Sequence, residues 1–285
     1  MAFNNLRKLA VFALSAAMIV SLGACGTSEK SDSAASSDSE SSSNTTGYDV
    51  SGVTKDDDIA AMLPESVTKD GKLTVGMDTS YAPAEFLAED GKTPVGFDVD
   101  IAKALANMFG LEVVPQTSNF DSIIPSIGTK YDIGISSFTI TPERMEAVDF
   151  VSMFKAGSTW EEEVNAAAKQ CKADGKSEVQ ILSNKLQTDV TTNVATGKAD
   201  VFYADSPVAG YAIAQTEDTL EALGEDVGVT KEAVAIKKGD SDTAKAVQAA
   251  LQKLMDDGTY MKILKHWGVE NGAIDKAEIN PTDLD

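Results

Sequence analysis

Residues whose types and spacing could bind a small anion lie together in one segment, which reads Ser136-Ser137-Phe138-Thr139-Ile140-Thr141-Pro142-Glu143-Arg144. Thr141 is a natural helix N-cap and Pro142 suits the first helical position, which places Arg144 in a first helical turn. Hydroxyl groups, unpaired helix N–H groups and a guanidinium can all donate hydrogen bonds to the same carboxylate. The segment therefore predicts a carboxylate receptor. The ordinary alternative, which spacing alone leaves open, is that Arg144 forms a surface ion pair worth about 0 to 1 kcal/mol.

Alternating strands and helices are predicted to position this segment. Short runs with alternating or β-branched apolar residues predict strands at 73–77, 111–114, 131–136, 179–182 and 199–204. Longer runs with apolar residues on one helical face predict helices at 98–109, 121–127, 161–172, 242–257, 259–267 and after Pro207. Strands separated by helices require parallel crossovers, so the predicted class is α/β with an open sheet. Two such clusters predict two lobes with a cleft, and ligands of open sheets bind in loops such as those after Met77, Ile135 and Tyr203.

Composition excludes several classes of function. With 45 Asp+Glu against 24 Lys+Arg, the 285-residue chain has a formal net charge of −21. Phosphate backbones and anionic lipid headgroups would repel such a chain, so nucleic-acid binding is not expected. A lone histidine, His266, and two cysteines provide no cluster for a catalytic metal, and no cofactor is expected. Apolar residues make up 42% of the chain, which is enough for the core of one or two domains.

The N-terminus has the pattern of a secretory signal. Two basic residues precede an apolar run at 9–22, which at about 14 residues is shorter than the roughly 20 that a transmembrane helix requires. The run ends in Leu22-Gly23-Ala24-Cys25, which resembles the lipobox of bacterial lipoproteins. We therefore predict a lipoprotein signal peptide at 1–24 and diacylation of Cys25, which would tether the mature protein to the outer face of the cytoplasmic membrane. An ordinary signal peptide with a chance cysteine is the alternative.

Segments of biased composition flank the predicted domains. Residues 26–46 are dominated by Ser and contain no aromatic or branched aliphatic residue, so they cannot offset the entropy of ordering. We expect a flexible Ser-rich linker at 25–68 and a mobile charged tail at 271–285. The chain between them is predicted to form lobe 1 from 69–157 and 237–270, and lobe 2 with the hinge from 158–236.

Several motifs follow one another in a characteristic order between Lys69 and Val269. The first five are Leu73-Thr74-Val75-Gly76, Tyr81-Ala82-Pro83-Ala84-Glu85-Phe86, Val95-Gly96-Phe97-Asp98-Val99-Asp100-Ile101-Ala102, Phe120-Asp121-Ser122-Ile123-Ile124-Pro125 and the segment from Ser137 to Arg144. Downstream follow Gly197-Lys198-Ala199-Asp200, Ala204-Asp205-Ser206-Pro207, Asp257-Gly258-Thr259-Tyr260 and Trp267-Gly268-Val269. Together they resemble the family 3 solute-binding proteins, which are extracytoplasmic receptors of ABC importers for polar amino acids. The resemblance implies a two-lobed, type II periplasmic-binding-protein-like α/β fold and a monomeric receptor that is not an enzyme.

The resemblance assigns the binding of an amino acid to six residues, Tyr81, Phe120, Ser137, Thr139, Arg144 and Asp205. The two aromatic rings would wall the ligand and offer a cation–π face to its ammonium group, although ordinary core packing is the alternative for both. The guanidinium and the two hydroxyl residues would hold the α-carboxylate, and the aspartate would accept hydrogen bonds from the α-ammonium. Opposite lobes would then bind opposite charges of the zwitterion, so ligand binding would favour the closed form. Asp78 is either a specificity residue for a cationic side chain or a turn residue.

The chain departs from this family after Trp160. In relatives the corresponding segment continues into a hinge strand, a basic turn and a second-lobe strand, whereas here Glu161 directly begins the next helix. A block of about 30 residues, enough for two strands and their connections, is therefore expected to be absent. Some relatives pair a cysteine at the position of Cys171 with one inside this block, so Cys171 is expected to be a free thiol. We predict an incomplete second lobe and weaker ligand binding than in an intact relative.

Three hypotheses for function follow. The first is a lipid-anchored amino-acid receptor that delivers its ligand to the permease subunits of an ABC importer. The second is a degenerate or internally deleted receptor that binds weakly or not at all. The third is a dehydratase on the same fold, for which Glu85, Asp205 or Glu232 are conceivable acids or bases, although none forms a recognisable catalytic constellation. The expected partners are a small-molecule amino acid, the ABC permease and, through the lipid anchor, a membrane.

Overall fold

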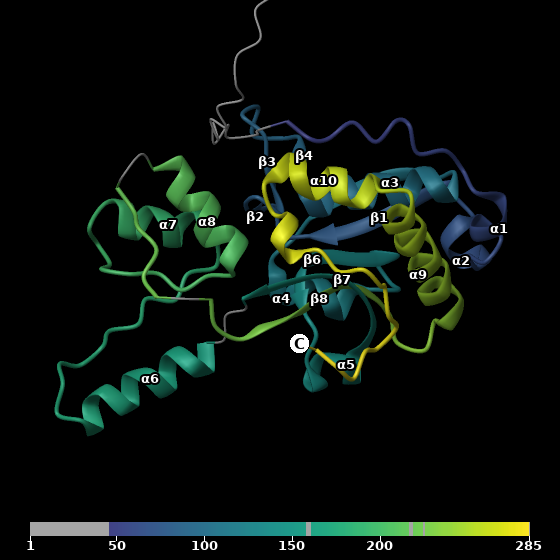
Figure 1. Cartoon of the computed structure of the whole chain (residues 1–285). Helices are drawn as coiled ribbons and strands as arrows, with labels where there is room; N and C mark the ends of the chain where they lie inside the picture. Colours follow the sequence, from purple (N-terminus) through teal and green to yellow (C-terminus); the bar gives the residue numbers. More distant parts are fainter. Residues whose placement is uncertain (1–45, 158–160, 217–218, 225, 285) are drawn as a thin grey trace, which may run out of the picture. The chain divides into compact units, whose positions relative to one another are not determined.

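The computed structural model describes residues 46–157, 161–216, 219–224 and 226–284 (Figure 1). The predicted signal peptide and the predicted lipidation site Cys25 lie outside this part of the chain. Strands and helices alternate along the described residues, which confirms the predicted α/β class. None of the described helices is both long enough and apolar enough to span a bilayer.

A mixed five-stranded sheet with the strand order β5-β1-β6-β8-β7 carries most of the structure. Its strands are β1 (Lys72–Met77), β5 (Glu112–Thr117), β6 (Ile133–Thr139), β7 (Val148–Gly157) and β8 (Val229–Lys237). β1 runs parallel to β5 and β6, whereas β8 runs antiparallel to β6 and β7. The predicted strands at 73–77, 111–114 and 131–136 are confirmed as β1, β5 and β6. Because β1 and β6 are parallel, their carboxyl ends lie at the same edge of the sheet.

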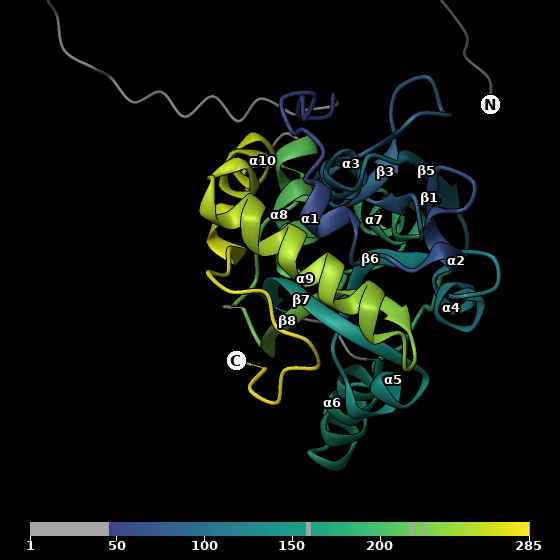
Figure 2. The same ribbon diagram turned by 90° about the vertical axis from the view of Figure 1, so that its right-hand side faces the viewer.

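Helices cover both faces of this sheet, as Figures 1 and 2 show. One face packs against α3 (Phe97–Phe109), α9 (Ser241–Asp256) and α10 (Thr259–Trp267). The other packs against α4 (Phe120–Ile123), the 3-10 helix η1 (Ile124–Ser126) and α5 (Pro142–Ala147). Alternate residues of β8 belong to the two cores, since Val234 lies in the first and Ala235 in the second. Because both faces of the strand are covered at this point, the residues from Ala233 to Ile236 are all apolar.

Local sequence signals set the ends of the elements near the cleft. Gly110 ends α3 in the left-handed conformation, with φ of 70°. Thr141 caps α5, where its hydroxyl oxygen accepts a hydrogen bond from the Arg144 N–H at 3.0 Å. A small antiparallel sheet follows β1 and consists of β2 (Ser80–Tyr81), β3 (Glu85–Leu87) and β4 (Pro94–Val95). The chain thus leaves the main sheet after β1 and returns through α3.

The segment between β7 and β8 contains α6 (Glu161–Ala173), α7 (Gln187–Ala195) and α8 (Ser206–Gln215) but, among its described residues, no strand. The predicted strands at 179–182 and 199–204 are therefore wrong. Their apolar side chains are largely in solvent, with Leu182 50% and Val201 65% exposed. A strand needs a partner strand for its backbone hydrogen bonds, and the absent block is expected to have supplied such partners. Cys171 on α6 is half-buried and forms no disulfide with another described residue.

Residues 46–68 differ from the expectation of a flexible linker that extends to residue 68. They form α1 (Asp57–Ala60) and α2 (Glu65–Thr68) and bury Val50, Leu63 and Val67 in the first core. The Asp56 side chain caps α1 by accepting from the N–H groups of residues 58 and 59. The apolar residues absent from 26–46 are thus present here, and their burial offsets the ordering entropy.

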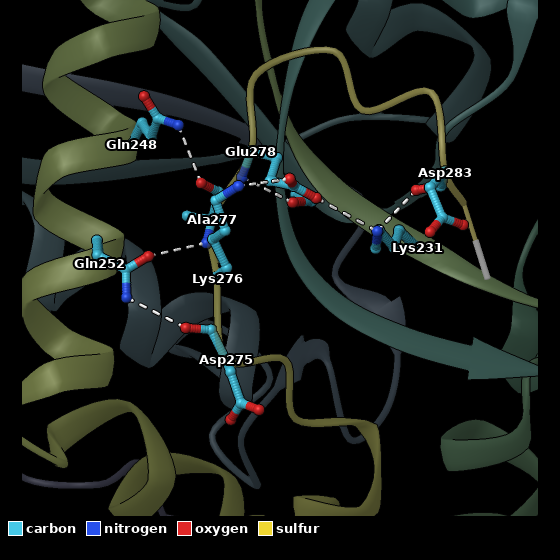
Figure 3. A network of polar contacts seen from close by, with 9 residues as sticks. Lys231, Gln248, Gln252, Asp275, Lys276, Ala277, Glu278 and Asp283 are labelled. Carbon is cyan, nitrogen blue, oxygen red and sulfur yellow. Dashed lines mark hydrogen bonds and ion pairs between the residues drawn. The ribbon is translucent and has the colours of Figure 1, made fainter.

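The C-terminal residues after η2 (Glu270–Gly272) correct the expectation of a mobile tail. Ile279 forms an antiparallel bridge with Val151 of β7, the outer strand of the sheet order. Figure 3 shows that the Lys231 ammonium binds the Asp283 carbonyl at 2.7 Å and the Glu278 carboxylate at 3.4 Å. On the other side of the tail, Gln252 of α9 contacts residues 275 and 277. The tail is ordered because it covers an otherwise unpaired strand edge.

Candidate functional site

All six predicted binding residues line one cavity of about 220 Å³. They come from separate parts of the chain, namely Tyr81 from β2, Phe120 from α4, Ser137 and Thr139 from β6, Arg144 from α5 and Asp205 from the residue before α8. The expected loops after Met77, Ile135 and Tyr203 all reach this cavity, through Asp78, the serine pair and Asp205. The cavity therefore lies at the edge where the parallel strands end.

A bulge in β6 sets the direction of the serine side chains. The pairing between β6 and β8 shifts register between Gly134 and Phe138, so the residues between them are not in the regular ladder. Ser137 has φ of 43°, a left-handed conformation that is uncommon for a residue other than glycine. Its N–H donates to the Asp98 carboxylate at 2.8 Å, and the Ser136 hydroxyl donates to the Glu85 carboxylate at 2.5 Å. Two carboxyl groups thus hold the bulge in place.

Arg144 lies at the cavity with only part of its donor capacity used. Its Nη1 donates to the Thr139 carbonyl at 2.9 Å, and its guanidinium carbon is 5.2 Å from the centre of the Phe120 ring. No carboxylate of the described residues forms an ion pair with Arg144. Burial lowers the pKa of the guanidinium, while the charges of Asp205, Glu143 and Asp121 act in the opposite direction. The alternative of a surface ion pair does not describe this arginine.

Asp205 lines the same cavity as Arg144, its charge acts on the Arg144 guanidinium, and it is 6% exposed. Its Oδ2 accepts a hydrogen bond from the Tyr81 hydroxyl at 2.7 Å. Burial, together with the negative charge of Asp205, raises the pKa of Tyr81 well above its ordinary value, so the phenol keeps its proton. Tyr81 is therefore a hydrogen-bond donor to Asp205 as well as an aromatic wall, which sequence reasoning did not find.

Asp78 and Phe120 meet at the end of β1. Asp78 Oδ2 accepts from the Phe120 N–H at 3.1 Å, and its Oδ1 accepts from the Ser80 hydroxyl at 2.8 Å. The Phe120 ring lies 5.0 Å from the Phe138 ring, in the second core, and also borders the cavity. Asp78 thus has the contacts of a turn residue, and Phe120 combines a packing role with a cavity-facing position.

The residues before and within α7 also line the cavity, which sequence reasoning missed. They are Asn184, Lys185, Gln187 and Val190. No motif singles them out, because the side chains reach the cavity only through the path of the chain before α7. Lys185 brings a positive charge to a cavity whose other lining residues include Asp78, Glu85 and Asp205.

Three buried carboxyl groups surround the bulge. Glu85, Asp98 and Glu232 are each at most 1% exposed. Burial raises the pKa of Asp98 to about 6 and raises the pKa of Glu85 well above its ordinary value, with a further rise from the Asp98 charge. Burial, assisted by the charges of Asp205 and Asp98, also raises the pKa of Glu232. Neither Glu232 oxygen has a hydrogen-bond partner in the described part of the chain.

A larger cavity of about 590 Å³ contains none of the predicted binding residues. It lies where β1 and β6 begin and is lined by residues that include Lys69, Lys130, Lys237 and Lys238. Within the described part of the chain, no group of His, Cys, Asp and Glu side chains is arranged to hold a metal ion. The smaller cavity is the one in which opposite charges converge, so it is the candidate binding site.

Sequence comparison finds known proteins that are similar to this chain. Residues 73–270 match the model of the bacterial extracellular solute-binding proteins, family 3. The arginine-binding protein ArgT of Corynebacterium glutamicum is 32% identical over 258 residues, which cover 80% of this chain and 84% of that protein. The L-cystine-binding protein TcyJ of Escherichia coli K12 is 28% identical over 228 residues, which cover 72% and 85%. These relatives are named as amino-acid-binding proteins.

Solved structures of the same kind share the fold. An ancestral amino-acid-binding protein, described as a precursor of cyclohexadienyl dehydratase, matches with a TM-score of 0.57 at 28% identity and covers 71% of this chain and 98% of its own. An ancestral arginine-binding protein bound to arginine matches with a TM-score of 0.56 at 28% identity and covers 69% and 98%. The predicted type II periplasmic-binding-protein-like fold is thereby confirmed. The chain belongs to the bacterial extracellular solute-binding proteins of family 3.

Proposed function

We propose that the protein is the lipid-anchored, extracytoplasmic receptor of an ABC importer and that it binds an amino-acid zwitterion between Arg144 and Asp205. The observation that carries this proposal is the cavity of about 220 Å³ that both residues line. The guanidinium has donors left for the α-carboxylate, since its one hydrogen bond to the described residues is with the Thr139 carbonyl. Asp205 would accept from the α-ammonium. No bond is made or broken in this role.

The ligand class that we propose is the basic amino acids. The lining residues Asp78, Glu85 and Asp205 outnumber the cations Arg144 and Lys185. The Asp78 and Asp205 carboxyl groups at the cavity wall would attract a cationic side chain. Relatives from Corynebacterium glutamicum and Pseudomonas aeruginosa are named as arginine-binding proteins, which supports the same class.

A thermal-shift screen of the protein against the twenty amino acids, followed by calorimetric titration, tests the proposal. A ligand at 100 times its dissociation constant stabilises the folded state by about 2.7 kcal/mol, which such a screen detects. We expect the largest shift with L-arginine or L-lysine. Agmatine, which lacks the α-carboxylate, should give a much smaller shift. A largest shift with an acidic amino acid would contradict the ligand class, and equal shifts with arginine and agmatine would contradict the role of Arg144.

A degenerate receptor is the second candidate, and one observation favours it. The segment between β7 and β8 lacks strands in its described residues and exposes apolar side chains, among them Leu182, Val201 and Leu223. Such a lobe would close over a ligand less effectively, because its packing is incomplete. Flat melting curves with all twenty amino acids would favour this candidate over the first.

The anchor and the absence of catalysis have separate tests. Replacement of Cys25 by Ser should release the protein from the membrane fraction into the medium, because diacylation would be lost. Retention of the Cys25→Ser variant would point to an uncleaved signal segment instead.

Turnover of a prephenate-like acid by the purified protein would favour the dehydratase hypothesis, whereas the receptor hypothesis predicts binding without product.

A further inference from the structure

Glu85 and Asp98 meet behind the serine bulge although 12 residues lie between them in the sequence. Gly96 allows the approach, since it has φ of 133° and a Cβ there would lie 2.0 Å from the Ala84 carbonyl oxygen. The next two N–H groups, of Phe97 and Asp98, donate to the carbonyls of Pro83 and Ala84 at 3.1 and 2.9 Å. The start of α3 is thus attached to the chain before β3, which brings the two carboxyl groups together.

Each carboxyl group holds one residue of the bulge. Glu85 Oε1 accepts from the Ser136 hydroxyl, and Asp98 Oδ2 accepts from the Ser137 N–H and lies 3.5 Å from its hydroxyl oxygen. The Ser136 hydroxyl oxygen in turn accepts from the Asp78 N–H at 3.0 Å. A left-handed serine costs on the order of 1 kcal/mol or more and persists only where its surroundings determine it. The hydrogen bonds to the two carboxyl groups hold Ser136 and Ser137 in this conformation.

One oxygen of each carboxyl group has no hydrogen-bond partner in the described part of the chain. Glu85 Oε2 and Asp98 Oδ1 are buried and have no donor among the described residues. An unpartnered carboxyl oxygen is costly to bury, and a proton on one of the two carboxyl groups would provide the missing donor. Two ionised carboxylates in this position would repel each other without compensation, because neither has an ion-pair partner in the described part of the chain.

We propose that Glu85 and Asp98 share a single proton and act as positioning residues, which hold Ser136 and Ser137 in the conformation that presents the Ser137 and Thr139 side chains to the ligand. Glu85 is the neutral partner and donates a hydrogen bond to Asp98, which stays ionised and also accepts from the Ser137 N–H. Ionisation of both groups or neutralisation of both would weaken the hold on the bulge. The effect on binding rests on the proposed function, whereas the shared proton does not.

The charges around the pair favour this distribution. The charge of Asp78 acts on Glu85, and the charge of Asp98 acts on Glu232 on β8. Tyr81 on β2, Lys185 before α7 and Asp205 before α8 line the cavity that Glu85 also lines. Burial is the main cause that raises the pKa of both carboxyls, and the neighbouring Asp98 charge raises the pKa of Glu85 further. Asp98 receives two hydrogen bonds from Ser137, which lower its pKa in part. These directions agree with a proton on Glu85 and an ionised Asp98 above about pH 6.

Titration of L-arginine into the wild type and four variants tests the positioning role. Glu85→Gln keeps a donor and an acceptor in place, so its dissociation constant should stay within about threefold of the wild type, whereas Glu85→Ala should lose more than about tenfold at pH 7. Wild-type affinity should fall about fivefold between pH 7 and pH 5 as Asp98 is neutralised, and Asp98→Asn should lose this dependence. The control Glu112→Gln removes an exposed carboxyl at the start of β5, away from the bulge, and should keep the pH dependence of binding. Equal losses in Glu85→Gln and Glu85→Ala, or an unchanged pH profile in Asp98→Asn, would overturn the proposal.

A measurement without ligand separates this proposal from the proposed function. Infrared spectroscopy of the ligand-free protein at pH 7 should show protonated carboxylic acid bands, one of which disappears in Glu85→Gln and a different one in Glu232→Gln. If L-arginine and the other amino acids fail to bind but the Glu85 band is present, the proposed function is wrong and the shared proton stands. If Glu85→Gln leaves all bands unchanged, Glu85 is ionised and the proposal is wrong whatever the ligand does.

Discussion

Arg144 lines the cavity and uses one guanidinium donor for the Thr139 carbonyl, while no carboxylate of the described residues forms an ion pair with it. A guanidinium can bind both oxygens of a carboxylate at once, whereas a lysine ammonium in the same place acts as a point charge. The Phe120 ring beneath the guanidinium limits its orientation. The chemical role of this position therefore depends on the planar fork and not on the charge alone.

Replacement of Arg144 by Lys should raise the dissociation constant of the amino acid by more than about tenfold, because the bidentate contact is lost while the charge is kept. The free energy of unfolding should change by less than about 1 kcal/mol, since the side chain is only half-buried. Calorimetric titration and urea unfolding measure the two effects. A variant that binds as tightly as the wild type would show that the α-carboxylate is held elsewhere.

Tyr81 joins the small sheet to Asp205 through its hydroxyl group. Replacement of Tyr81 by Phe removes this hydrogen bond without removing the ring, and should lower the free energy of unfolding by about 1 kcal/mol. Tyr48→Phe is a matched control, because the Tyr48 hydroxyl forms no hydrogen bond with another described residue and its ring contacts His266 edge-on. Urea unfolding at pH 7 compares the two. Equal stabilities of the Tyr81 variant and the wild type would mean that the contact with Asp205 adds nothing to the ligand-free fold.

At the scale of elements, the C-terminal tail replaces a missing neighbour strand for β7. Asn280 makes the most specific contacts, since its Oδ1 accepts from the Phe150 N–H at 2.8 Å and its Nδ2 donates to Asp149 at 3.0 Å. Its own N–H donates to the Phe150 carbonyl at 2.9 Å. The Asn280 side chain thus satisfies backbone and side-chain groups of β7.

Replacement of Asn280 by Ala should lower the free energy of unfolding by about 1 to 3 kcal/mol, because the buried Phe150 N–H loses its acceptor. The neighbouring Thr282 is exposed and serves as the control, with an expected change within about 0.5 kcal/mol for Thr282→Ala. Chemical denaturation measures both. Similar small effects from the two variants would indicate that the tail is only loosely attached in solution.

At the scale of the whole molecule, buried carboxyl groups make stability depend on pH. Burial raises the pKa of Glu232 in the folded state above its ordinary value of 4.5. Between that value and its folded pKa, the folded state therefore binds more protons than the unfolded state, so the free energy of unfolding falls as the pH rises. Exposed carboxyls such as Asp56 and Glu278, whose pKa is lowered by lysine contacts, act in the opposite direction.

Between pH 5 and pH 8 the free energy of unfolding should therefore fall less in Glu232→Gln than in the wild type. The difference should be up to about 1.4 kcal/mol for each pH unit. Glu112→Gln, at the exposed start of β5, is the control for the loss of one carboxyl group. Urea unfolding at several pH values measures the difference between each variant and the wild type. Parallel pH profiles of Glu232→Gln and the wild type would show that Glu232 is not protonated by folding.

Local patterns predicted the elements that stabilise themselves or face one large core. Residues 73–77 and 131–136 alternate as buried strands do, and α3 ends at the glycine that its pattern indicates. The Thr141 cap and the position of Arg144 in the first turn of α5 also follow from neighbouring residues. The six binding residues could be named from motifs, and the structure brings all of them to one cavity.

Predictions failed where the outcome depended on distant partners. The patterns at 179–182 and 199–204 are those of strands, yet no described strand lies beside them and they remain irregular. The tail looked mobile because its own composition is polar and charged, although β7 and α9 supply the contacts that order it. Composition describes what a segment can contribute, not what another part of the chain offers it.

From sequence alone one can derive the α/β class, the family resemblance and the identity of the opposed charges at Arg144 and Asp205, because these depend on residue types and short-range order. Tertiary structure decided which groups lie together where no sequence motif indicates it, such as Tyr81 with Asp205 and Glu85 with Asp98. The physical reason is that burial and proximity set the protonation of a carboxyl group, and both arise only when separate segments pack together.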